Sequence, residues 1–88
     1  MKTKQGFMLR SVGGRNVVVP IGQASLEFNG MITLNETGAF IWKMLQTGCT
    51  YNELIDAIKK EYDATEEDIK TGVDALLAQM REANLLEE

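Results

Sequence analysis

The sequence predicts an α+β domain of the winged helix-turn-helix type, in which a small N-terminal antiparallel sheet of three or four strands precedes three helices. Residues 7–34 contain short apolar, β-branched runs separated by turn signals, whereas residues 35–84 carry apolar side chains at helical spacing. The charge changes at the same point. Residues 1–34 carry four basic and one acidic residue, and residues 35–88 carry five basic and twelve acidic residues. At 88 residues, a single domain spanning 1–88 is expected.

Four segments within residues 7–34 have the features of strands. Residues 7–12 and 16–21 are joined by two glycines and predict a hairpin. Residues 24–28 alternate apolar and polar side chains, and residues 29–30 are Asn-Gly, which favours a two-residue turn because both positions accept positive φ. The last predicted strand comprises Met31, Ile32, Thr33 and Leu34.

The first helix is predicted over residues 35–47 and is the element that the others are expected to surround. Asn35 is a favourable N-cap, and Gly48 accepts the left-handed conformation that ends many helices. Two apolar stripes run along this helix, and one of them contains Trp42, which we expect in the core. A short helix with two such stripes is expected to pack between the sheet and the other two helices.

Two further helices are predicted over residues 50–62 and 65–84. Thr50 and Glu53 have the spacing of a capping box. At the other end of the last helix, Asn84 is expected to adopt the left-handed conformation of a Schellman motif. Each helix has one apolar stripe, so each is expected to bury one face against the first helix.

The residue types exclude several kinds of chemistry. The chain has no histidine and one cysteine, which excludes histidine-based acid–base catalysis, Ser-His and Cys-His nucleophile pairs and the usual zinc sites. We therefore expect no enzymatic activity, no metal and no cofactor. The longest apolar run covers residues 17–21, far short of the ~20 residues that span a membrane. With no visible signal peptide, a cytoplasmic protein without membrane contact is expected.

The order of these features resembles the PqqD family over almost the whole chain. The resemblance is carried by Leu34-Asn35 at the end of a strand, Trp42 in the following helix, the Gly48 to Thr50 turn, Tyr62-Asp63, and Leu76-Leu77 with Leu85-Leu86. The sequence departs from quinone-pathway members, which tend to have Pro-Glu-Gly where this chain has residues 28–30, Phe-Asn-Gly. Met80 and Asn84 also replace a more usual Leu and Gly. The chain is therefore more similar to a paralogous PqqD-like protein.

The resemblance implies a non-catalytic peptide-binding domain, the RiPP recognition element. Such domains bind the leader segment of a ribosomally made precursor peptide and present it to a modifying enzyme, often a radical SAM protein. The leader adds as a strand to the last strand of the sheet and lies against the third helix. In this sequence the implied peptide-binding residues are Met31, Ile32, Thr33, Leu34, Lys70, Val73, Asp74, Leu77 and Arg81.

Other interpretations stay open at this point. The last strand is equally explained as an internal member of the sheet, Val73 and Leu77 as core, and the charged residues of the third helix as a solvated face. Gly72 is explained by close helix packing or by close approach of a peptide. A winged-helix DNA-binding protein is an alternative, but residues 65–84 carry five acidic and two basic residues, which argues against nucleic acid. A protein-interaction domain with another partner is the other alternative. Monomer and homodimer are both compatible with the sequence.

Overall fold

The structure, a computed structural model, describes residues 1–22 and 32–87. Its elements are β1 (Lys2–Thr3), β2 (Phe7–Val12), β3 (Arg15–Pro20), β4 (Ile32–Leu34), α2 (Glu36–Thr47), α3 (Tyr51–Glu61), α4 (Glu66–Glu82) and β5 (Leu86–Glu87). Antiparallel strands precede three helices, so the predicted fold class is confirmed. The expected strand at residues 24–28 and the residue Met31 lie outside the described residues.

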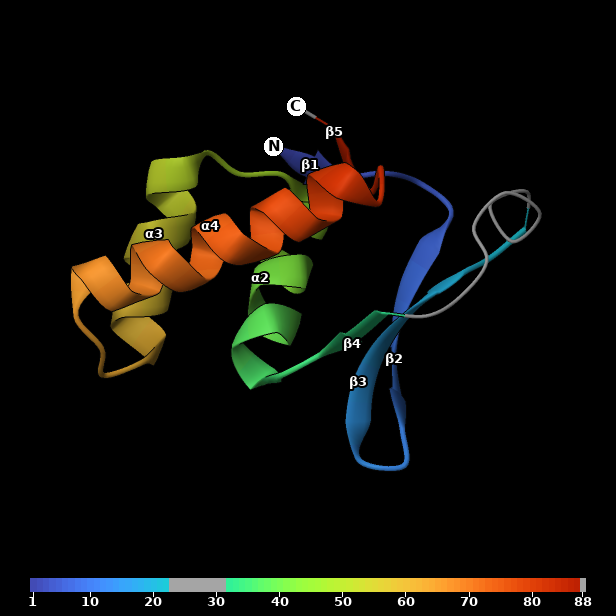
Figure 1. Ribbon diagram of the computed structural model, residues 1–88, viewed down its shortest axis with the longest axis horizontal. Helices are drawn as coiled ribbons and strands as arrows, with labels where there is room; N and C mark the ends of the chain where they lie inside the picture. Colours follow the sequence, from blue (N-terminus) through green and yellow to red (C-terminus); the bar gives the residue numbers. More distant parts are fainter. Residues whose placement is uncertain (23–31, 88) are drawn as a thin grey trace.

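Strands β2, β3 and β4 form an antiparallel sheet in that order. The predicted hairpin is present, and Gly13 and Gly14 in its turn have φ values of 58° and 78°, as a type I′ turn requires. Val18 of β3 pairs with Ile32 of β4 and is almost fully buried. The β2–β3 hairpin extends away from the helices as a wing (Figure 1).

Helix α2 is the central element, as its two apolar stripes predict. The Asn35 side chain accepts a hydrogen bond of 2.7 Å from the N–H of Gly38 and caps the first turn. The helix contacts β1 and β4 as well as α3, and Trp42 is only 2% exposed. The second stripe is half-buried, and there the ring of Phe40 lies edge-on to Tyr62 with 5.8 Å between the ring centroids.

The ends of α3 and α4 follow the local signals in the sequence. The capping box is formed in both directions: Thr50 Oγ1 accepts from the N–H of Glu53 at 3.1 Å, and Glu53 Oε1 accepts from the N–H of Thr50 at 2.8 Å. After α4, Asn84 has a φ of 61°. The N–H of Leu85 then donates to the carbonyl of Met80 at 2.8 Å, which closes the predicted Schellman motif.

A second, two-stranded sheet was not expected from the sequence. Antiparallel β1 and β5 pair Lys2 with Glu87 and Thr3 with Leu86, so the two ends of the chain lie side by side (Figure 1). Two-residue strands are too short to show any periodicity, and their partners are far apart in the sequence. This pairing holds Leu86 against the core.

Candidate functional site

A groove of about 610 Å³ lies between the β4–α2 segment and helix α4, and the end of α3 also contributes to it. It is lined by Thr33, Leu34, Asn35, Thr37, Gly38, Ile41, Ile58, Tyr62, Asp63, Ala64, Asp68, Ile69, Gly72, Val73, Ala75, Leu76 and Gln79. Its volume is within the range of ligand-binding pockets in proteins.

Apolar side chains of the core reach the groove from all the elements that form it. Leu34 comes from β4, Ile41 from α2, Ile58 from α3, and Ile69 and Val73 from α4. All five are buried members of the core cluster. Since these residues already pack against one another, the groove has a rigid apolar surface that does not depend on a ligand to form.

Strand β4 borders this groove and, within the described residues, has one unpaired edge. It pairs with β3 on one side, and among the described residues no strand pairs with its other side. An open edge presents backbone N–H and C=O groups to an incoming strand. Thr33 is exposed in this strand and lines the groove. Within residues 1–22 and 32–87, β4 is therefore an outer strand of its sheet, and the strand expected at residues 24–28 lies outside this range.

Some of the residues predicted for the site do come together. Thr33, Leu34 and Val73 line the groove, and Ile32 lies half-buried in the same strand as the first two. Leu77 is 2% exposed, belongs to the core cluster and does not line the groove.

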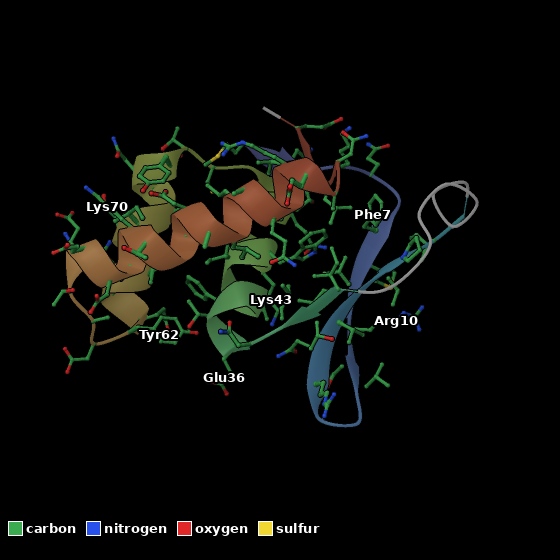
Figure 2. The ribbon with its side chains drawn as sticks, in the orientation of Figure 1. Phe7, Arg10, Glu36, Lys43, Tyr62 and Lys70 are labelled. Carbon is green, nitrogen blue, oxygen red and sulfur yellow. The ribbon has the colours of Figure 1, made fainter. Side chains whose placement is uncertain are left out.

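The three charged residues predicted on the last helix do not line the groove. Lys70, Asp74 and Arg81 lie about 160–200° around the axis of α4 from Gly72, because successive residues of a helix are about 100° apart. Asp74 instead accepts a hydrogen bond of 2.8 Å from the hydroxyl of Tyr51 on α3. Figure 2 shows Lys70 and Tyr62, which does line the groove, on opposite sides of α4.

Helix α4 presents a different set of residues to the groove. Besides the buried Ile69 and Val73, its lining residues are Asp68, Gly72, Ala75, Leu76 and Gln79. The exposed ones recur at intervals of three or four, which places them on one face. The spacing can be seen in the sequence, but small and polar residues do not show whether a helix face lines a groove or simply faces solvent. Among these exposed residues, the sequence draws attention to Gly72 alone.

The charged residues that line the groove are acidic. Asp63 and Asp68 stand at its end near the α3–α4 turn, and no lysine or arginine is among the lining residues that the structure describes. The groove thus favours a neutral or cationic ligand over an anionic one. Across residues 1–22 and 32–87, no group of three or more Cys, Asp or Glu residues is placed to hold a metal ion.

The one cysteine does not contribute to the groove. Burial is the main cause that raises the pKa of the Cys49 thiol above its ordinary value. A raised pKa leaves the thiol protonated at neutral pH, which is the opposite of what an activated nucleophile needs.

The described residues together define a small winged-helix-like domain in which an outer strand borders an apolar groove. The family model described as "Coenzyme PQQ synthesis protein D (PqqD)" matches residues 7–86. The chain therefore belongs to the PqqD family, and the resemblance seen in the sequence is confirmed. A search of curated proteins finds no significant match.

Two solved structures share this fold. "TbiB1 in Complex with the TbiA(beta) Leader Peptide" is 22% identical with a TM-score of 0.76, covering 99% of this chain and 95% of that one. "Lasso peptide synthetase B1 complexed with the leader peptide" is 16% identical with a TM-score of 0.74, covering 99% and 96%. At these identities the likeness shows the fold. In the described part of the chain, no helix has the length and hydropathy needed to cross a membrane.

Proposed function

We propose that this protein binds the leader segment of a ribosomally made precursor peptide as an added strand along β4, with the peptide's side chains in the groove. The observation that supports the proposal most is the edge of β4 that no strand of residues 1–22 and 32–87 pairs with, beside an apolar groove. Strand addition of this kind obtains affinity from main-chain hydrogen bonds and selectivity from pockets for alternate side chains.

The comparisons support the same role. Both similar structures are described as complexes with a leader peptide. The proposed role is binding rather than catalysis: the protein holds the leader and presents it to a modifying enzyme, for which a radical SAM protein in the cytoplasm is the proposed partner.

The charges of the groove and of α4 argue against DNA binding. Helix α4 would be the recognition helix of a winged-helix DNA reader, yet it carries five acidic and two basic residues. Its first turn alone contains Glu66, Glu67 and Asp68. A helix with this charge is repelled by phosphates, whereas DNA-binding helices carry basic residues.

The test places proline in β4. Successive N–H groups of a strand point to opposite edges, so one of the Ile32 and Thr33 amides points to β3 and the other to the open edge. We would select peptides on the wild-type protein from a displayed library of random peptides and then titrate one of them, made synthetically. Ile32→Pro and Thr33→Pro are both expected to weaken binding about tenfold or more, because one removes an amide that would bond to the peptide and the other removes an amide that holds β4 against β3. The variant whose lost amide faces the open edge is expected to keep more of its thermal stability.

The matched controls are Arg10→Pro and Ser11→Pro on β2, the other outer strand of the same described sheet. One of them also loses an amide that faces away from β3, and it should bind the peptide like the wild type. Amide NMR shifts on peptide addition should concentrate on residues 32–34 and on the groove-lining face of α4. Equal binding by a folded β4 proline variant, or no peptide selected by the wild type, would contradict the proposal. Self-association along β4 would appear as a concentration-dependent dimer that competes with the peptide.

A further inference from the structure

Gly72 lies in the interior of α4, where nothing in the fold of the described residues requires a glycine. Apart from proline, glycine is the residue least favourable to a helix interior, because it loses the most backbone entropy. Its position within a regular seventeen-residue helix also needs no special backbone conformation. Two explanations for a glycine at this position remain, which are close packing inside the protein and space for a ligand.

Packing among the described residues does not explain Gly72. Apart from the neighbouring backbone of α4, a Cβ atom built at this residue meets no atom of the described residues within 4 Å. Gly38, the other helical glycine, is a clear contrast, since a Cβ there lies 3.2 Å from both Asn35 Oδ1 and Leu34 Cβ. A side chain at Gly38 would press on the cap of α2 and the end of β4, whereas a side chain at Gly72 would meet no such contact in the described residues.

The open space at Gly72 belongs to the groove. Gly72 lines it together with Ala75, which is close to one helical turn further along α4 and is also small and exposed. The two residues leave a gap in the α4 wall, and the buried Ile69 and Val73 lie next to it. An atom that enters this gap is therefore in contact with apolar surface.

A peptide strand paired with β4 would reach this gap with a side chain rather than with its backbone. The backbone of an added strand lies about 4.8 Å from β4, and its alternate side chains project from the plane of the sheet towards the layer that contains α4. We infer that Gly72 is a selectivity determinant that leaves room for one large apolar side chain of the bound peptide. This inference rests on the proposed function and adds to it the class of side chain recognised.

The experiment compares Gly72→Ala and Gly72→Leu with a control of equal bulk on the same helix. Ala78→Leu is that control, because Ala78 is exposed and does not line the groove. Gly72→Ala should raise Tm by roughly 4–8 °C, since alanine is the better helix former, and should still weaken binding of a peptide selected on the wild type. Gly72→Leu should weaken that binding about tenfold or more, and Ala78→Leu should leave it within about twofold.

The peptide gives a second, independent readout. Replacing one large apolar residue of the selected peptide by alanine should lower the peptide's affinity for the wild type. The same peptide substitution should change the affinity for Gly72→Leu little, because the leucine already fills the gap. Selection on Gly72→Leu should favour smaller residues at that peptide position. Unchanged binding by a folded Gly72→Leu protein, or a lower Tm for Gly72→Ala, would overturn the inference. The proline variants of β4 would still report on the proposed function by itself, so the two failures are distinguishable.

Discussion

The hydroxyl of Tyr51 donates a hydrogen bond of 2.8 Å to Oδ1 of Asp74, which joins the first turn of α3 to the middle of α4. The bond is the main reason that the pKa of Tyr51 is raised above that of an ordinary tyrosine. The bond lies on the side of α4 away from Gly72, so Asp74 has a hydrogen-bond partner on α3 and does not line the groove.

The first prediction concerns this pair. Asp74→Ala should bring the pKa of Tyr51 back towards its ordinary value, as measured by phenolate absorbance in a Tyr62→Phe background that removes the other tyrosine. A raised pKa in the folded state means that the bond contributes stability below the ordinary tyrosine pKa and loses it as the pH rises through the folded one. Because the pair is at the surface, Tm at neutral pH should fall by only a few degrees. A large loss of peptide affinity in the same variant would contradict the placement of Asp74.

The second prediction concerns the charge of the groove. Asp63→Asn and Asp68→Asn should weaken binding of a cationic peptide by roughly two- to fivefold at low salt, because they remove the carboxylates that line the groove. Added salt should diminish the effect, since it screens exposed charges. The measurement is a titration of each variant with one cationic and one neutral peptide.

Charge reversal on the other side of α4 is the control for this prediction. The sequence by itself suggests that Lys70→Glu and Arg81→Glu alter peptide affinity. Because neither residue lines the groove, we expect a change of less than about twofold for a neutral peptide. If these two variants changed peptide affinity more than Asp63→Asn and Asp68→Asn do, Lys70 and Arg81 would be peptide-binding residues, as the sequence suggests.

The third prediction concerns acid stability. The hydrogen bond from the N–H of Thr50 is the main cause that lowers the pKa of Glu53, and Lys59 lowers that of Glu66 in the same way. A carboxylate whose pKa is lowered by folding contributes stability above its unfolded pKa and loses it as the pH falls through the folded one. Stability should therefore decrease below the ordinary glutamate pKa.

Denaturant unfolding at several pH values tests this acid dependence. Glu53→Gln should show a weaker dependence than the wild type, because glutamine can still accept from Thr50 but does not titrate. Thr50→Ala should cost about 1 kcal/mol at neutral pH through loss of the cap. A parallel pH profile for Glu53→Gln and the wild type would show that the capping box does not contribute to acid unfolding.

The fourth prediction concerns the end of α4. Asn84 has a φ of 61°, which glycine adopts without strain and a β-branched residue does not. Asn84→Val should therefore lower the free energy of unfolding by about 1–3 kcal/mol. Asn84→Gly should stay within about 0.5 kcal/mol of the wild type and lose mainly the contact with the Lys4 ammonium group. Thermal unfolding of the two variants side by side checks the prediction, and equal losses would contradict it.

Features that depend on neighbouring residues were predictable from the sequence. The strand over residues 7–12 and the hairpin that follows it are where the glycine turn places them. The N-caps at Asn35, Thr50 and Thr65 are all formed, because a cap joins atoms only three residues apart. Observed helix ends differ from the predicted ones by at most two residues.

Features that depend on distant residues were not predictable. The β1–β5 sheet joins residues more than eighty positions apart, and no periodicity announces strands of two residues. Of the residues predicted for the site, Thr33 and Leu34 of β4 and Val73 of α4 line the groove, and their contact with a peptide stays a prediction. Lys70, Asp74 and Arg81 lie on the side of α4 that does not line the groove. The sequence does not predict this, because polarity alone does not tell which exposed face of a helix borders a groove.

The sequence by itself determined the family, the order of β2, β3, β4 and the three helices, and the apolar side chains that form the core, because these depend on local hydrogen bonds and on periodic burial. The tertiary structure alone decided which face of α4 borders the groove and that no side chain of the described residues fills the space at Gly72. Both depend on how α4 is rotated about its axis relative to β4. That rotation is set by the packing of Val73 and the other core residues and is not encoded in any single stretch of the chain.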